Sequence, residues 1–504
     1  MPRHNLICIL LVGLVSLVCY GRIDRNPYGR YFTEVIDTIE NEALLKVSRK
    51  ELWNGAMEGI VARLHKGGDQ HSDFYPSEKV ADFNQELRQE FVGVGIRLEL
   101  YPELKQIIIL APIYGSPADQ AGIKAGDVIV AVDGHRLAVD RQRTKKQIMD
   151  DVKTRIEGNA GDSVTLSVLH LGAKEPVDVP IVRKLVHVPT IVGDKPGSKG
   201  TWSYYSPGYG KIAYVRMQHF SETSTTDLKS TIDRLRETGM QALVLDLRGN
   251  RGGRLDVAIA ACDLFLDKGQ VIVSTRNRRG EKDRPDSLAS GAGPFTDFPM
   301  AVLVNEGSAS ASEIVAACLQ DHRRAVVVGQ RSYGKGTVQD VLWIEGGASR
   351  LKLTKSSFWR PSGKQIHRSW HDGKSAPPED DWGVIPDDGL LLEIDDLEQS
   401  HLNRARHSRD YPQAPPLPAE KTKKTIKQPS GEPQDSDPKN DEEPRDSDPK
   451  NSEKKTPGPT KKNPSDKKSS DKKPSDAPAA DAPWPQIDRQ LILALEYLQK
   501  QVAK

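Results

Sequence analysis

Cysteine is scarce in this sequence, and its placement argues against a metal site. Of the four cysteines, Cys8 and Cys19 lie in an apolar N-terminal segment, while Cys262 and Cys318 stand in apolar patterns typical of helices. A buried free thiol is the common state for cysteines of the second kind. No spacing of Cys and His in the chain suits a metal ion, so we expect neither a metal nor any other cofactor.

The chain also has little excess charge of either sign. Lys and Arg total 72 and Asp and Glu total 70, which gives a net charge of +2 at pH 7. Proteins that bind nucleic acid duplexes usually carry a concentrated basic field, so we expect no nucleic-acid partner. The 504 residues, 37% of them hydrophobic, suffice for two or three domains with buried cores.

The N-terminal residues have a pattern that is typical of a targeting segment. A basic start, Arg3-His4, precedes the apolar run Leu6–Val18, which is too short for an ordinary membrane span. Because Cys19-Tyr20-Gly21 offers a small-x-small cleavage site, residues 1–21 predict a signal peptide and export to the periplasm or cell envelope. The alternative is an uncleaved segment that anchors the protein to a membrane.

The pattern of apolar residues changes several times along the chain, and each change marks a new region. Residues 27–90 repeat apolar side chains at helical spacing, which predicts an N-terminal helical region. Residues 91–184 hold short strand-like runs between glycine turns, which predicts a β-rich module. Over residues 185–400, apolar strands alternate with helices at Leu255–Leu266 and Ala311–Leu319, which predicts an α/β core whose mixed sheet is covered on both faces.

The C-terminal part has a different composition. Residues 412–483 consist mainly of Pro, Lys, Asp, Ser and Glu, and the hexapeptide Asp-Ser-Asp-Pro-Lys-Asn occurs twice. Such a segment cannot bury enough apolar surface to offset the entropy lost on ordering, so we expect a disordered linker. Residues 484–504 regain an amphipathic pattern and predict a C-terminal helix that docks on the core.

A turn of small residues, Gly307–Ser312, stands between a predicted strand and a predicted helix. A serine on such a turn can project its hydroxyl, and the helix N-terminus behind it offers free N–H groups to a developing oxyanion. Ser308, Ser310 and Ser312 compete for the part of nucleophile. Each of them could instead do no more than cap the helix.

Lys335 lies between two glycines after a buried strand, an unusual place for a solubilising lysine. If Gly334–Gln339 is extended, Lys335 and Gln339 share one face. A lysine acts as a general base only when neutral, which from a reference pKa near 10.4 costs about 4 kcal/mol at pH 7.5 unless burial lowers the pKa. Neighbouring valines favour that burial, and the neutral amide of Gln339 can orient the amine without holding its positive charge.

A pair of Ser and His is the alternative for the same chemistry. His322 stands twelve residues after Ser310, which on one helix is roughly 18 Å away and out of reach. Spacing does not exclude His219, at the end of a predicted strand. A Ser-His hydrolase of small esters therefore stays open.

Several stretches together carry a resemblance to a known family. In order along residues 30–395 they are FVGVGIRL, SPADQAGIKAGDVIVAVDG, LVLDLRGNRGG, NEGSASASEIVAACLQDHRRAVVVGQRSYGKGTVQ, LKLTKSSFWRPSGKQI and IPDDG. The chain resembles the carboxy-terminal processing peptidases, also called tail-specific proteases. The string around Ser310 and Lys335 is highly specific to that family, whereas the second string belongs to PDZ domains of many proteins.

The resemblance implies a role for each matching residue. The family's nucleophile falls on Ser310, its lysine base on Lys335 and its lysine-orienting glutamine on Gln339. Its oxyanion hole, two backbone N–H groups, falls on Gly253 and Ala311. The chain-end pocket of its PDZ domain falls on the loop Gly93, Val94, Gly95 and Ile96, whose N–H groups can hold a carboxylate.

The resemblance implies a serine endopeptidase that cleaves proteins with exposed C-termini. Three places depart from the family's pattern: Gly67–Pro76 replaces a tighter Asp-Pro-His-Ser segment, a polar insertion lies between Ile366 and Pro386, and the expected linker interrupts what in relatives is a short connection to a final helix. A scaffold that binds chain ends without catalysis is the rival from another class. An adaptor partner and a homo-oligomer both stay open.

Overall fold

The computed structural model describes residues 11–14, 27–88, 90–139, 142–368, 370–371, 374–375, 381–417 and 483–504. Most of the expected signal peptide, 1–21, and of the expected linker, 412–483, therefore lies outside the described residues. Among the helices that are described, none is both long enough and apolar enough to cross a membrane.

The core is a five-stranded sheet in the order β10-β13-β14-β17-β18. Four strands are parallel, and β10 runs antiparallel to β13. Every residue of the three central strands is buried, which explains their continuous apolar sequences. The strands are β10 (Ile191–Val192), β13 (Ile212–Met217), β14 (Ala242–Asp246), β17 (Met300–Val304) and β18 (Val326–Gly329).

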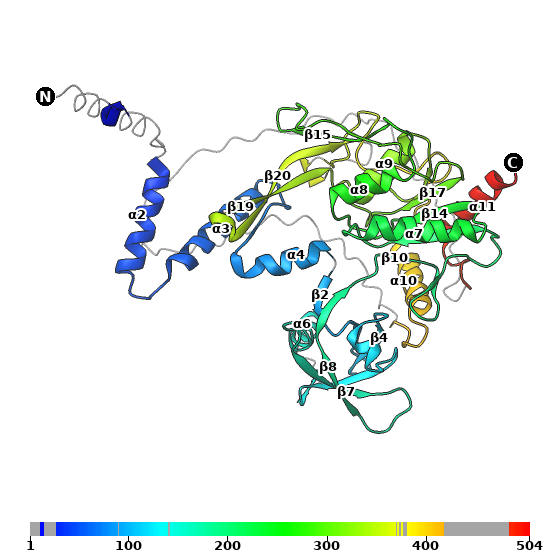
Figure 1. Ribbon diagram of the computed structural model, residues 1–504, viewed down its shortest axis with the longest axis horizontal. Helices are drawn as coiled ribbons and strands as arrows, with labels where there is room; N and C mark the ends of the chain where they lie inside the picture. Colours follow the sequence, from blue (N-terminus) through cyan, green and yellow to red (C-terminus); the bar gives the residue numbers. More distant parts are fainter. Residues whose placement is uncertain are drawn as a thin grey trace, which may run out of the picture.

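Helices cover both faces of this sheet. Side chains alternate along a strand: Ala213 and Val215 pack with α7 (Ser224–Glu237), α8 (Leu255–Asp263) and α9 (Ala311–Asp321). Ile212 and Tyr214 face the other way and pack with α11 (Arg489–Val502), whose apolar side chains complete that layer. Figure 1 shows α7, α8 and α9 together, with α11 near the C-terminus of the chain. The predicted mixed α/β fold is confirmed.

A second, antiparallel sheet contains the strand that follows Lys335. β20 (Ser349–Trp359) pairs with β19 (Thr337–Ile344), β15 (Val271–Asn277) and β1 (Asp73–Tyr75), and β16 (Ser287–Leu288) pairs with β15. β1 comes from the region predicted as helical. The sequence did not show it, because three residues form a strand only through pairing with a distant partner.

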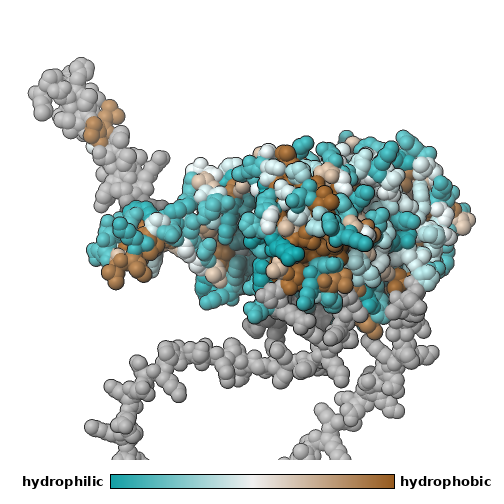
Figure 2. Space-filling view, turned by 90° about the horizontal axis from the view of Figure 1, so that it is seen from below, coloured by the Kyte–Doolittle hydropathy of each residue, from teal (hydrophilic) through white to brown (hydrophobic). Residues whose placement is uncertain are grey.

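The rest of the N-terminal region is helical. It comprises α2 (Pro27–Glu42), α3 (Arg49–Lys66), the 3-10 turn η1 (Ser77–Lys79) and α4 (Val80–Arg88). α2 extends away from the body of the molecule in Figure 1. Tyr28, Tyr31 and Val35 on it are at least half exposed, and Figure 2 shows apolar residues on this protruding part.

Between α4 and the core lies a six-stranded module. Its sheet follows the order β3-β4-β5-β7-β8 with β6 paired to β5, and α6 packs against it. β2 pairs with β9, so the two ends of the module leave side by side. The elements are β2 (Glu90–Gly93), β3 (Ile96–Tyr101), β4 (Gln106–Pro112), α5 (Pro117–Gln120), β5 (Val128–Val132), β6 (His135–Arg136), α6 (Lys145–Ile156), β7 (Ser163–Leu169), β8 (Val177–Val182) and β9 (Lys184–His187).

A few short elements complete the chain. α10 (Asp396–Asp410) follows the core and reaches toward the module. The others are β11 (Lys195–Pro196), β12 (Trp202–Ser203), η2 (Glu345–Gly347), β21 (Trp370–His371) and β22 (Lys374–Ser375).

Candidate active site

Ser310 occupies a strained position between β17 and α9. Its backbone has φ 56° and ψ −114°, although it is not a glycine. Non-glycine residues with positive φ are uncommon and cost free energy, so they persist where the surrounding contacts hold them. The residue directly precedes the first turn of α9, where backbone N–H groups have no partner within the helix.

The structure separates the three competing serines. Ser308 and Ser312 are fully buried. Ser308 Oγ donates to the Leu247 carbonyl and Ser312 Oγ to the Asn250 carbonyl, both at 2.8 Å. These two hydroxyls therefore tie the serine turn to the loop after β14. Ser310 between them is only partly buried, which leaves its side chain as the accessible one.

The loop Leu247–Gly253 packs against the serine turn and brings the Gly253 N–H to it, beside the N–H of Ala311 at the start of α9. A Cβ on Gly252 would lie 2.9 Å from both the Ala311 nitrogen and Ser310 Cβ, so only glycine fits there. Phe220 bonds to Gly252 and Arg254 on either side of Gly253. Among the described contacts, neither the Gly253 N–H nor the Ala311 N–H donates to a protein acceptor, which suits an oxyanion hole.

Lys335 lies on the connection between β18 and β19, and its two glycines have a packing reason. A Cβ on Gly336 would lie 2.2 Å from the His367 nitrogen, and one on Gly334 would lie 2.7 Å from Arg368 Cβ. The chain after β20 therefore packs directly on both sides of Lys335. Burial, and next the positive charge of Lys352, lowers the pKa of Lys335, the direction that a general base needs.

Glu313 connects the serine and lysine segments, and the sequence analysis missed it. Its side chain is fully buried. Oε2 accepts from the Ser310 N–H and the Lys335 N–H, both at 2.8 Å, and Oε1 accepts from Ser332 Oγ and the Gly334 N–H, both at 2.6 Å. The available signal was the Ser-x-x-Glu spacing of a capping box.

Two opposing effects act on Glu313. Burial raises the pKa of its carboxyl to about 7, and the four hydrogen bonds act against that rise. All four partners donate, so the geometry fits the ionised carboxylate. A proton on this group would break at least one of the four bonds.

Gln339 belongs to β19, which begins at Thr337. Its Nε2 donates to Thr337 Oγ1 at 2.9 Å and to Thr354 Oγ1 at 3.2 Å, and Thr354 Oγ1 donates to Asp69 Oδ1 at 2.8 Å. Thr337 and Gln339 thus share a face, as an extended segment requires. Within the described contacts, no hydrogen bond joins Lys335 to Gln339 or to Ser310.

Three histidines bear on the Ser-His alternative, and they lie in different places. His322 ends α9, the helix that Ser310 begins, and its Nε2 lies 2.7 Å from the Val271 carbonyl. His219 directly precedes Phe220, which bonds to the oxyanion loop, so it remains an alternative. His71, which the sequence analysis did not single out, lines a cleft together with Lys335. Burial and the charge of Lys335 lower the pKa of His71 to about 4, so it is neutral at pH 7.

The chain-end loop Gly93–Ile96 lies in the six-stranded module, between β2 and β3. The Val94 side chain is fully buried. The Gly95 carbonyl accepts from the Ile113 N–H and from Ser116 Oγ, and the Val94 carbonyl accepts from the Ala118 N–H. The N–H groups of Val94 and Gly95 have no acceptor among the described residues, so they are available to a carboxylate.

Comparison with known proteins identifies two domains in the chain. Residues 211–387 match the model of peptidase family S41, and residues 108–169 match a PDZ domain. A carboxy-terminal-processing protease of Bartonella bacilliformis is 34% identical over 351 residues, which cover 68% of this chain and 74% of the relative. A probable CtpA-like serine protease of Staphylococcus aureus is 30% identical over 380 residues, 74% of this chain and 70% of the relative.

Among solved structures, the photosystem II D1 C-terminal processing protease matches with a TM-score of 0.40 and 24% identity, over 73% of this chain and 93% of that one. The chain belongs to peptidase family S41, as a C-terminal-processing serine protease with a PDZ domain. The expected family and the expected enzyme class are confirmed, and the rival scaffold without catalysis is set aside.

Proposed function

We propose that the chain is an exported endopeptidase that cuts proteins near their C-termini with Ser310 as nucleophile and Lys335 as general base. One observation carries the proposal. A single oxygen, Glu313 Oε2, accepts from the backbone N–H groups of both Ser310 and Lys335 at 2.8 Å. This carboxylate fixes the nucleophile and base segments relative to each other.

The proposed reaction proceeds in two steps. Neutral Lys335 takes the proton of Ser310 Oγ while that oxygen attacks the scissile carbonyl carbon. The N–H groups of Gly253 and Ala311 bind the oxyanion of the tetrahedral intermediate. Lys335 then gives the proton to the leaving amine, and the same lysine activates the water that hydrolyses the Ser310 ester.

Gln339 supports the base through its oxygen. Both of its N–H groups are directed to Thr337 and Thr354, so its Oε1 is left to accept a hydrogen bond from the Lys335 amine. Because the amide is neutral, it orients the amine without raising its pKa as a carboxylate would.

The PDZ domain is proposed to bind the C-terminus of the substrate at Gly93–Ile96. The free N–H groups of Val94 and Gly95 support this assignment. We expect a peptide with an amidated C-terminus to be cut more slowly than its free-acid form when both are below saturation. Equal rates for the two peptides would remove chain-end recognition from the mechanism.

Export rests on the apolar N-terminal segment alone, with the periplasm or cell envelope as destination and a membrane anchor as the uncleaved alternative. Cell fractionation with and without residues 1–21 tests it. For the activity, unfolded proteins are incubated with the purified enzyme and the new chain ends are mapped by mass spectrometry. Cuts near the C-termini, absent with Ser310→Ala, support the proposal; hydrolysis restricted to small esters and abolished by His219→Ala would replace it.

A further inference from the structure

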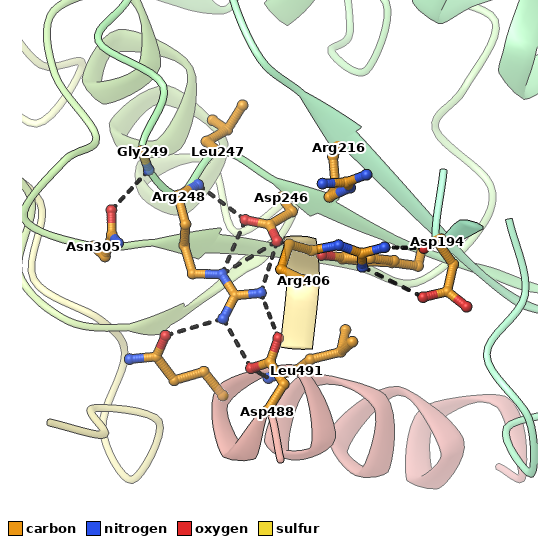
Figure 3. A network of polar contacts seen from close by, with 12 residues as sticks. Asp194, Arg216, Asp246, Leu247, Arg248, Gly249, Asn305, Arg406, Asp488 and Leu491 are labelled. Carbon is orange, nitrogen blue, oxygen red and sulfur yellow. Dashed lines mark hydrogen bonds and ion pairs between the residues drawn. The ribbon is translucent and has the colours of Figure 1, made fainter. Parts of the chain in front are cut away.

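A cluster of buried and partly buried charges lies at the carboxyl end of β13 and β14 (Figure 3). It contains equal numbers of arginines and aspartates, which come from both strands, the segment after β10, the loop after β14, α10 and the start of α11. Its members are Arg216, Arg248, Arg406, Arg409, Asp194, Asp246, Asp410 and Asp488. Since the charges balance, removing any one of them leaves one charge of the cluster uncompensated.

Asp488 joins this cluster to the C-terminal helix. Its carboxylate binds the Arg248 guanidinium through two bonds, at 2.9 and 2.8 Å. The same carboxylate accepts from the Leu491 N–H at 3.0 Å and so caps the first turn of α11. Gln490 adds a third contact, accepting from Arg248 at 3.2 Å. The end of the helix and the arginine are therefore held as one unit.

Arg248 stands at the beginning of the oxyanion loop. The next residue, Gly249, donates its N–H to Asn305 Oδ1 at 2.8 Å, and Asn305 ends the strand side of the serine turn. Farther along the same loop, Gly252 lies against Ser310. A displacement of Arg248 would thus reach the loop whose Gly253 N–H faces the oxyanion.

The helix that supplies Asp488 is bound to the core by packing. Leu491, Leu495 and Leu498 are fully buried against the face of the sheet opposite to α9. In sequence, residues 418–482 separate α11 from the described chain before it. In the part of the chain that the structure describes, no helix or strand of the core continues into α11, so the contacts above are what place it.

We propose that α11 is a positioning element of the active site. Asp488 and Gln490 hold Arg248, and Arg248 holds the oxyanion loop in its position beside Ser310. This inference rests on the proposed Ser310 mechanism. Without these contacts the enzyme still binds substrate but stabilises the transition state poorly. The expected signature is a loss in kcat with little change in KM, because the oxyanion forms only during the reaction.

The full-length chain tests this with matched pairs of variants. Asp488→Asn is compared with Glu496→Gln, an acid-to-amide change at an exposed position of the same helix. We expect Asp488→Asn to lower kcat at least tenfold with KM changed less than about twofold, by analogy with loss of an oxyanion donor. The Glu496→Gln variant should match the unaltered enzyme. Both are measured well below the unfolding temperature and corrected for the folded fraction.

A milder pair guards against misfolding of Asp488→Asn. Gln490→Met removes the contact to Arg248, together with the bonds that Gln490 donates to Leu392 and Gln330, while filling a similar volume. Gln499→Met makes the same change at an exposed position of α11. We expect a several-fold loss of kcat and of the rate of fluorophosphonate labelling for Gln490→Met, and none for Gln499→Met. If Asp488→Asn and Gln490→Met keep the kcat of their controls, or raise KM alone, α11 only stabilises the fold. Turnover that survives Ser310→Ala would instead overturn the proposed mechanism itself.

Discussion

The two halves of the active site are built differently. On the serine side, Ser308 and Ser312 are fully buried and bonded to the oxyanion loop, and Ser310 holds a strained backbone. On the lysine side, Lys335 lies on a connection before β19, partly buried and beside a cleft. The comparison indicates that buried hydrogen bonds hold the serine side in place, whereas the lysine side borders a cleft and its partial burial lowers the pKa of Lys335.

The largest expected effect is on the serine side. Ser310→Ala should abolish peptide hydrolysis and leave the fold intact, because it removes one hydroxyl from an accessible turn. Ser308→Ala and Ser312→Ala should keep much of the activity and lose about 0.5–1.5 kcal/mol of stability each, since each removes one buried hydrogen bond while the carbonyl keeps a backbone donor. Steady-state rates and thermal unfolding of the three variants check this. Full turnover in Ser310→Ala would refute the assignment.

The second largest effect on turnover is expected for Lys335→Arg. A guanidinium keeps the charge but does not deprotonate, so we expect no measurable turnover. In the unaltered enzyme, kcat/KM should rise with pH through one ionisation that lies below the ordinary pKa of lysine, since burial lowers the pKa of Lys335. An active Lys335→Ala together with an inactive His219→Ala would favour the Ser-His alternative.

The sequence predicted much of this site, for reasons that differ between its halves. Apolar runs indicate the strands, and helical spacing indicates α9. The glycines of the oxyanion loop are indicated by their position after a buried strand. The buried contacts of Glu313, Thr354 and Asp488 were not predictable, because each joins residues far apart in the chain. Pairing of β1 with β20 was missed for the same reason.

Glu313→Gln should have an intermediate effect, because it loosens the tie between the two halves. An amide has one acceptor oxygen where four donors need two, so we expect kcat to fall on the order of tenfold to a hundredfold. The negative charge of Glu313 raises the pKa of Lys335. Its removal should therefore shift the midpoint of the kcat/KM profile to lower pH, which a merely structural loss would not do.

The same variant changes the pH dependence of stability. The folded-state pKa of Glu313, about 7, lies above its ordinary value of 4.5. Its contribution to the free energy of unfolding is therefore full below the ordinary pKa and is lost as pH rises through about 7. Unfolding by denaturant at pH 5 and pH 8 should show a smaller difference in Glu313→Gln. An unchanged difference would mean that the carboxyl titrates normally.

The smallest effect on kcat is expected at Thr354, which lies on the lysine side of the site. Thr354→Val keeps the shape but removes the hydroxyl between Gln339 and Asp69. The Gln339 amide then loses one of its two fixed partners, so we expect kcat to fall several-fold with KM unchanged. Thr337→Val removes the other hydroxyl that accepts from the Gln339 amide, so it should give a similar loss of kcat. A rise in KM alone would place Thr354 in substrate binding.

The central claim, that Ser310 is activated by Lys335, is tested most directly by mapping a fluorophosphonate label. The unaltered enzyme, Lys335→Arg and His219→Ala are labelled in parallel, digested and sequenced by mass spectrometry. The account predicts an adduct on Ser310 in the unaltered enzyme and in His219→Ala, and none in Lys335→Arg. An adduct on Ser308 or Ser312, or labelling of Ser310 that depends on His219 and persists in Lys335→Arg, would contradict it.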